Sequence, residues 1–164
     1  MIDLRDWAYV LLCVSFSLVL GAGVYEHLAV WPYAYAAPPA SLSMFQGAYG
    51  LNGGAFWAKI HPVTLLLFVV VAVLTWRTPR RLHVLVPLLG YIVILAVTST
   101  YFVPELLAIN ATPYRDAVDP ELLARSLRWE RLSLVRLFVA VPLVLYLVVG
   151  LAKAGRPVRE AALA

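Results

Sequence analysis

The chain has 164 residues, of which 63% are hydrophobic and 13% are charged, with a formal net charge of +4. A soluble domain is ordinarily about half apolar and about a quarter charged, so this composition excludes such a domain and indicates a membrane protein. The arginines and lysines lie mostly between apolar runs. Because they form no continuous basic face, we expect no nucleic-acid partner.

Four apolar stretches are long enough to cross the bilayer core. We therefore expect an all-α, antiparallel four-helix transmembrane bundle that forms a single domain over residues 1–164. The helices are predicted at about 7–31, 56–76, 83–106 and 129–152, with long loops at about 32–55 and 109–128. A cleaved signal peptide is the alternative for the first run, but residues 1–6 form no positive n-region and the apolar stretch is too long for such a peptide.

Glu26 and His27 lie side by side near the end of the first apolar run. Ionisable groups inside a membrane are costly and usually face a protein interior, where they serve a function. Because the two residues are adjacent, they point about 100° apart on a helix. We expect His27 to face the centre, since it stacks one turn above Gly23, where a small residue lets a neighbouring helix approach.

The other predicted helices carry polar groups at the same depth. His61 begins the second helix, Glu105 ends the third and Glu130 begins the fourth. Antiparallel packing brings these groups to one face of the membrane. Arg136 lies about 9 Å deeper than Glu130 along the fourth helix, where it needs a polar partner. We expect one of the carboxylates to be that partner.

Several further polar or aromatic residues are predicted to line this site. Gln46 and Asn52 lie in the first long loop, which we expect to fold back over the mouth of the bundle. Tyr101 shares a helical face with Thr98 and Glu105, and Trp129 shares one with Ser133 and Arg136. Trp129 also fits the aromatic belt that is typical of membrane interfaces.

The segment Trp129-x3-Ser133-x2-Arg136 resembles the Trp-x3-Asn-x2-Arg segment that opens the last helix in a family of small four-helix membrane proteins. That family includes the anthrone-oxygenase-like proteins. Pro32 at the end of the first helix and Phe45-Gln46 are similar to the family pattern as well. The resemblance implies a four-helix bundle, and it suggests oxygen insertion into a lipophilic substrate without a dedicated cofactor.

Two interpretations of the site remain open. In the first, the chain is an oxidoreductase or oxygenase that acts on a lipophilic small molecule. Its catalytic residues are then His27, His61, Glu26 and Glu105, and its substrate-binding residues are Arg136, Trp129, Tyr101, Glu130, Asn52 and Gln46. In the second, the chain is a non-catalytic accessory subunit or small-ligand binder whose ion pairs are structural.

The cofactor is equally open. Imidazole is the commonest metal ligand, so His27 and His61 are candidates to hold a metal ion or haem b. The Glu-x-x-His pairs of carboxylate-bridged di-iron bundles are absent from the sequence. Three alternatives therefore stay open for the cofactor: none, a metal ion or haem b.

Charge asymmetry predicts the orientation. The chain termini and residues 77–81 lie on one side of the predicted bundle, and they carry most of the arginines and lysines. Residues 32–57, on the other side, contain none. The positive-inside rule then places both termini in the cytoplasm. We expect membrane lipid as the surrounding partner and the inner membrane of a bacterium as the location.

Overall fold

The computed structural model describes residues 3–153, and over this range the chain is helical and contains no strand. Four helical spans are long and apolar enough to cross a membrane. They are α1 (Leu4–Ala29) with the short α2 (Trp31–Ala34), α3 (Gly54–Thr75), α4 (Arg81–Val97) with α5 (Val103–Asn110), and α6 (Pro120–Val149). The expected all-α bundle with four membrane-crossing helices is confirmed.

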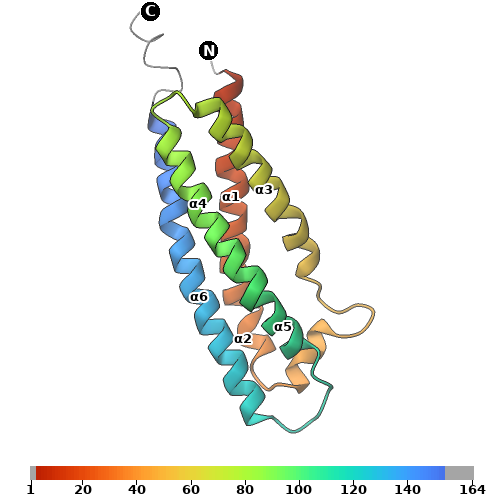
Figure 1. The fold of residues 1–164 in the computed structure, drawn as a ribbon. Helices are drawn as coiled ribbons and strands as arrows, with labels where there is room; N and C mark the ends of the chain where they lie inside the picture. Colours follow the sequence, from red (N-terminus) through yellow and green to blue (C-terminus); the bar gives the residue numbers. More distant parts are fainter. Residues whose placement is uncertain (1–2, 154–164) are drawn as a thin grey trace, which may run out of the picture.

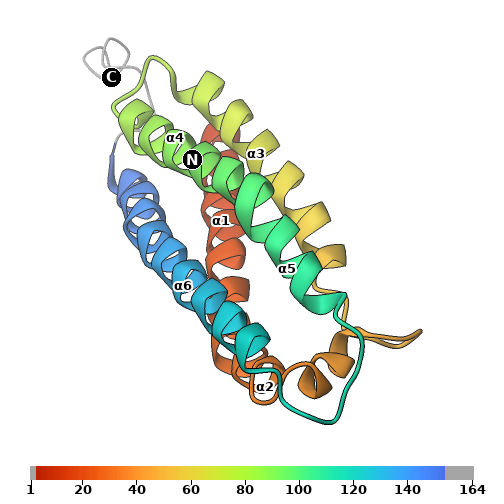
Figure 2. The same ribbon diagram turned by 60° about the horizontal axis from the view of Figure 1, so that its bottom comes forward.

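The four spans form a ring, in which α1 packs against α3 and α6 while α4 packs against the same two helices (Figures 1 and 2). The start of α1 and the end of α6 lie at one end of the bundle, together with the short turn between α3 and α4. At the opposite end, α2 and the 3-10 helix η1 (Ala40–Phe45) fold beneath the bundle. The first long loop is thus a folded cover, as expected.

The fourth helix begins earlier than the sequence analysis predicts. Helix α6 starts at Pro120 instead of about residue 129, and it continues as the 3-10 helix η3 (Gly150–Ala152). Asp119 is its N-cap, because the side chain accepts hydrogen bonds from the backbone of Glu121 and Leu122. Asp followed by Pro at the first helical position is a strong start signal. The first turns of α6 are amphipathic and rich in polar residues, and this composition alone favours a loop.

A π-helical segment, η2 (Thr98–Phe102), joins α4 to α5. Pro104 lies two residues after this segment, and proline has no backbone N–H to continue the α-helical ladder. Instead, the N–H of Val103 reaches back to the carbonyl of Thr98. The hydroxyls of Thr98, Ser99 and Thr100 each donate to the carbonyl four residues earlier. These bonds keep the polar backbone of the irregular turn satisfied inside the membrane.

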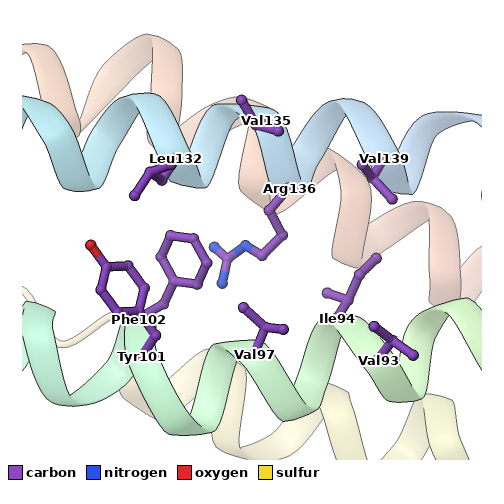
Figure 3. A pocket seen from close by; sticks show the side chains of 9 residues that line it. All are labelled: Val93, Ile94, Val97, Tyr101, Phe102, Leu132, Val135, Arg136 and Val139. Carbon is purple, nitrogen blue, oxygen red and sulfur yellow. The ribbon is translucent and has the colours of Figure 1, made fainter.

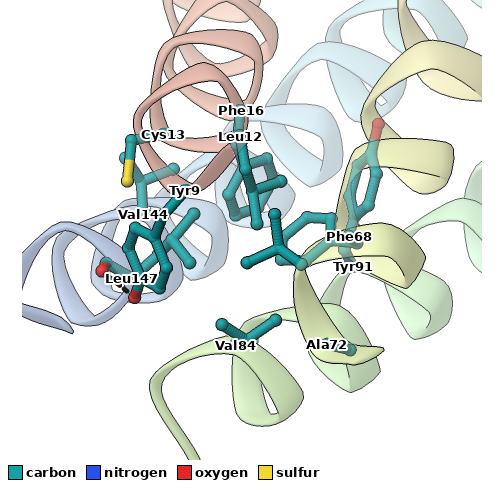
Figure 4. Close-up of a cluster of buried hydrophobic side chains, with 11 residues drawn as sticks. Tyr9, Leu12, Cys13, Phe16, Phe68, Ala72, Val84, Tyr91, Val144 and Leu147 are labelled. Atoms are coloured by element: carbon teal, nitrogen blue, oxygen red, sulfur yellow. Dashed lines mark hydrogen bonds between the residues drawn. The ribbon is translucent and has the colours of Figure 1, made fainter. Parts of the chain in front are cut away.

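The interior is divided into two apolar cores. The first lies toward the chain termini and contains Tyr9, Leu12, Phe16, Phe68, Tyr91 and Leu147 among others (Figure 4). The second lies toward the long loops and contains Trp31, Tyr35, Leu42, Phe102 and Trp129 among others. In α1, α4–α5 and α6, polar residues separate the segments that supply the two cores. We call these residues the polar layer: Glu26 and His27 on α1, Thr98 at the end of α4, and Ser133 and Arg136 on α6. The polar layer is the candidate site.

Candidate functional site

Arg136 is the central charge of the polar layer. It lies half-buried on α6, where Nη1 donates to Thr98 Oγ1 at 2.8 Å and Nη2 donates to Ser133 Oγ at 3.0 Å. Its Cζ lies 4.3 Å from the centroid of the Phe102 ring. A guanidinium over an aromatic face gains a cation–π interaction that is stronger when water is excluded. Two hydroxyls and one ring thus hold the side chain in a fixed position.

The expected ion pair of Arg136 is wrong. Among residues 3–153, Arg136 forms no salt bridge, and its hydrogen bonds go to neutral hydroxyls. Glu26 is the carboxylate whose charge acts on Arg136. However, Glu26 Oε1 accepts a hydrogen bond from Trp57 Nε1 on α3 at 2.8 Å. Glu26 therefore pairs sideways with Trp57 on α3.

His27 faces α6, as expected. Its Nε2 lies 3.2 Å from Ser133 Oγ, the same hydroxyl that binds Arg136. A Cβ added at Gly23, one turn away, would lie 2.9 Å from Leu137 on α6, which shows how closely the two helices approach. Ser133 consequently bridges an imidazole on α1 and a guanidinium on α6.

His61 lies in a different hydrogen-bonded pair. Its Nδ1 is 2.6 Å from the hydroxyl of Tyr91 on α4, and its ring stacks on Trp57 with centroids 5.1 Å apart. His27 and His61 therefore contact different partners. Within residues 3–153, no group of three or more His, Cys, Asp or Glu side chains is placed to hold a metal ion.

A shared hydroxyl nevertheless joins two helices of the layer. Arg136 is linked to His27 through Ser133, whose hydroxyl contacts both side chains. His27 belongs to α1, whereas Arg136 belongs to α6. The layer thus holds one fixed positive charge and one imidazole in contact with the same hydroxyl.

Glu105 does not belong to this layer. It forms a bidentate ion pair with Arg125 on α6, with oxygen–nitrogen distances of 2.5 and 2.8 Å. The predicted spacing of Thr98, Tyr101 and Glu105 assumes a regular α-helix. The π-helical turn adds a residue, and each added residue rotates the following positions by about 100°. Glu105 is therefore turned away from Thr98, toward the loop half of α6.

The remaining predicted residues divide between the site and the scaffold. Gln46 Nε2 donates to the carbonyls of Asn110 and Thr112, so it ties the first loop to the end of α5. Asn52 is exposed, and its Oδ1 accepts from the backbone N–H of Ala55 at the start of α3. Glu130 lies half-buried on α6, one residue after Trp129, and it forms no salt bridge within the described chain.

Trp129 is a core residue and not part of an interfacial belt. It is 3% exposed, packs edge-on against Trp31 and Phe102, and donates from Nε1 to the Phe102 carbonyl at 2.9 Å. It therefore positions the π-helical turn that carries Thr98 and Phe102. The shared face of Trp129, Ser133 and Arg136 points inward, as their spacing predicts.

A groove of about 310 Å³ runs between α4–η2 and α6 (Figure 3), and it is open to the outside of the bundle along exposed valines. Its walls are aliphatic or aromatic, and Arg136 is the one charged residue among them. The lining residues are Val93, Ile94, Val97, Tyr101, Phe102, Leu132, Val135, Arg136 and Val139. Of the predicted substrate-binding residues, Tyr101 and Arg136 lie in this groove.

Four residues that the sequence analysis did not assign to the site now belong to it. These are Thr98, Ser133, Phe102 and Trp57, which contact Arg136 or Glu26. Spacing indicates three of them, because Trp57 shares a face with His61, Ser133 with Arg136 and Thr98 with Tyr101. Nothing in the sequence indicated that Thr98, and not a carboxylate, would bind the guanidinium.

The fold and the site define a class of protein: a four-helix bundle with membrane-crossing helices, in which a polar layer containing one fixed guanidinium separates two apolar cores. Comparison of the chain with family models, with curated proteins and with solved structures found no match.

Proposed function

We propose that this protein binds a lipophilic small molecule that carries a carbonyl or acidic oxygen, and that Arg136 is the anchor for that oxygen. The observation that carries the proposal is a guanidinium without a salt bridge at an apolar, lipid-facing groove. A buried arginine ordinarily has a carboxylate partner or a water-filled cavity. Arg136 has two neutral hydroxyls as partners and retains unused N–H donors, because a guanidinium has five.

The depth of Arg136 favours a ligand that dissolves in the membrane core. Arg131 is exposed, and it lies one and a half turns nearer the loop end of α6 than Arg136 does. The rise per residue therefore places Arg136 about 8 Å deeper in the membrane. A headgroup would have to leave the interface to reach it. A small molecule with one oxygen on an otherwise apolar body fits both the groove walls and this depth.

Oxidation of such a ligand is the reaction that we propose. If the ligand has an acidic C–H group beside its carbonyl, His27 accepts the proton through Ser133 and Arg136 stabilises the negative charge that forms on the oxygen. The enolate carbon then forms a bond to dioxygen, and protonation gives a hydroperoxide on that carbon. Loss of water from the hydroperoxide, with the second C–H proton, leaves a new carbonyl, so one CH2 group and one O2 give one C=O group and one water. This chemistry agrees with the resemblance to anthrone-oxygenase-like proteins, and it needs no residue outside the polar layer.

A polyketide anthrone tests the proposal directly. Purified protein in lipid nanodiscs is titrated with the anthrone without oxygen, and binding is followed by the melting temperature. Oxygen is then admitted, and its consumption and the formation of the quinone are measured. Arg136→Gln should weaken binding at least tenfold, since a charge-assisted hydrogen bond is lost. His27→Gln should retain binding and lose turnover.

The matched control is Arg131→Gln, because Arg131 is an exposed arginine on the same helix that forms no salt bridge within the described chain. It should bind and turn over the anthrone like the original protein. Equal binding by Arg136→Gln and Arg131→Gln would show that Arg136 is not the anchor, and the proposal would be wrong.

The second candidate is a non-catalytic ligand-binding or accessory protein whose polar layer is structural. It is favoured by one observation, that Glu26, His27 and His61 each have a hydrogen-bond partner within the bundle. In the same experiment, binding without oxygen consumption in the unmodified protein would favour this candidate.

We further propose that both termini are cytoplasmic, which places the polar layer in the extracytoplasmic half of the membrane.

A further inference from the structure

The turn between α3 and α4 carries three arginines, and the structure assigns them different roles. Arg80 points inward and is 6% exposed. Its guanidinium pairs with Asp6 at 2.6 Å, donates to the carbonyls of Lys153 and Leu151, and lies over the Tyr9 ring. Arg80 therefore joins the start of α1, this turn and the end of η3 into one unit.

Arg77 and Arg81 point away from this unit and are exposed. Neither forms a salt bridge within residues 3–153. The Cζ of Arg81 lies 5.7 Å from the centroid of the Trp76 ring, and Trp76 itself is 54% exposed. An exposed tryptophan beside unpaired arginines is typical of the level where lipid headgroups meet the hydrocarbon.

The turn that carries them is fixed. Thr78 is 8% exposed, its hydroxyl donates to the Thr75 carbonyl at 2.9 Å, and the same oxygen accepts from the backbone N–H of Arg80. Because Thr78 and Arg80 are both anchored, the backbone of Arg77 and Arg81 is held on either side of them. Both exposed side chains thus extend from a backbone held in one conformation, and the Arg81 guanidinium is further placed by its contact with the Trp76 ring.

At the opposite end of the molecule, two arginines form ion pairs with carboxylates. There Arg115 pairs with Asp119 and Arg125 pairs with Glu105. Carboxylates thus neutralise part of the positive charge at the loop end, whereas Asp6, which pairs with Arg80, is the acidic partner found at the α3–α4 turn. Within the described chain, Arg77 and Arg81 therefore keep their positive charges without an ion pair.

We propose that Trp76, Arg77 and Arg81 form a binding site for the phosphate headgroup of an anionic phospholipid. The two arginines bind phosphate oxygens, for which the planar guanidinium is well suited. Trp76 lies at the level of the glycerol and upper acyl chain. This site is independent of the function proposed for Arg136, because it lies at the other end of the membrane-crossing helices.

The test compares two double variants of equal charge in detergent. Arg77→Gln/Arg81→Gln removes the proposed site, and Arg128→Gln/Arg131→Gln removes two exposed arginines near the opposite end. Each protein is titrated with phosphatidylglycerol, phosphatidylcholine or inorganic phosphate, and the melting temperature is recorded. Phosphatidylglycerol should stabilise the unmodified protein and the second variant. Its apparent affinity for the first variant should be weaker by about tenfold or more.

Fluorescence provides a measurement that needs no charge variant. Phosphatidylglycerol brominated in its upper acyl chain should quench the unmodified protein more than brominated phosphatidylcholine does, and Trp76→Phe should abolish the difference. Equal effects of the two double variants, or equal responses to both lipids, would overturn the proposal. Stabilisation by inorganic phosphate alone to the same extent would also overturn it, since the site would then bind a free anion.

Discussion

Arg136 is held by two hydroxyls and an aromatic ring, and this choice of partners decides what its removal does. Removing one member of a buried ion pair leaves an uncompensated charge and is strongly destabilising. When Arg136 is removed, its two hydroxyl partners carry no charge and each keeps another contact. The Thr98 hydroxyl still donates to the carbonyl of Ile94, and Ser133 still contacts His27.

We therefore expect Arg136→Leu to have a melting temperature equal to or above that of the unmodified protein, while binding of the anthrone is lost. Replacing a buried charge by an apolar side chain is often neutral or stabilising. Thermal unfolding of the purified protein in detergent measures the first effect. A large fall in the melting temperature would instead identify Arg136 as a structural residue and favour the second candidate function.

Trp57 is the donor that Glu26 needs, so its replacement should be costly. Trp57→Phe retains an aromatic ring for packing against His61 but removes the N–H that Glu26 accepts. A buried polar group that loses its partner costs about 1–3 kcal/mol. Unfolding free energies should show a loss of that order for Trp57→Phe. Trp76→Phe, at an exposed tryptophan, should change the stability far less.

A double variant checks the cause of that loss. If the hydrogen bond is responsible, Trp57→Phe should cost much less in a protein that already carries Glu26→Leu, because no buried acceptor is then left unpaired. An equal cost in both backgrounds would assign the effect to packing of the indole ring.

At the scale of single elements, the start of α6 depends on Asp119. Hydrogen bonds from the backbone of Leu122 and Glu121, together with Arg115, hold the pKa of Asp119 below its ordinary value of 3.8. A lowered pKa means that the native state favours the ionised carboxylate. The stabilisation is therefore complete above pH 3.8 and is lost as the pH falls through the lower native value.

Amide hydrogen exchange should report this change locally. We expect the amides of residues 121–123 to be protected at pH 6 and to lose protection selectively near pH 3, after correction for intrinsic rates. Asp119→Asn should remove most of this pH dependence, because asparagine still caps a helix but does not ionise. Identical pH dependence in Asp119→Asn would mean that another group controls the first turn of α6.

For the molecule as a whole, the distribution of free charge predicts the orientation. The arginines at the loop end are partly paired with carboxylates, whereas Arg77 and Arg81 at the other end are not paired within residues 3–153. The positive-inside rule counts arginines and lysines, and residues 77–81 carry three arginines where residues 32–57 carry none. Two of the arginines that contribute to the sequence argument, Arg156 and Arg159, lie outside the described residues.

Cysteine labelling in intact cells tests the orientation in a Cys13→Ala background. A reagent that cannot cross the membrane should label Ala48→Cys and leave Lys153→Cys unlabelled until the cells are opened. Both positions are exposed, and they lie at opposite ends of the bundle. Labelling of Lys153→Cys alone in intact cells would reverse the orientation.

Composition and apolar run length by themselves determined the fold class and the number of membrane-crossing spans. A run of about 20 apolar residues has few alternatives in a bilayer, because a helix satisfies its own backbone. Helical spacing also placed His27, Ser133 and Arg136 on inward faces. These properties follow from local sequence, so no knowledge of the neighbouring helices is needed to infer them.

The tertiary structure alone decided which polar groups are partners. Glu105 and Glu26 both lie at a suitable depth to neutralise Arg136, yet Glu105 pairs with Arg125 and Glu26 with Trp57. The π-helical turn before Pro104 rotates Glu105 away, and Thr98, at the start of that turn, binds the guanidinium instead. Depth along a helix can be read from residue number, but the direction of a side chain depends on every irregular turn before it and on the packing of the helices around it.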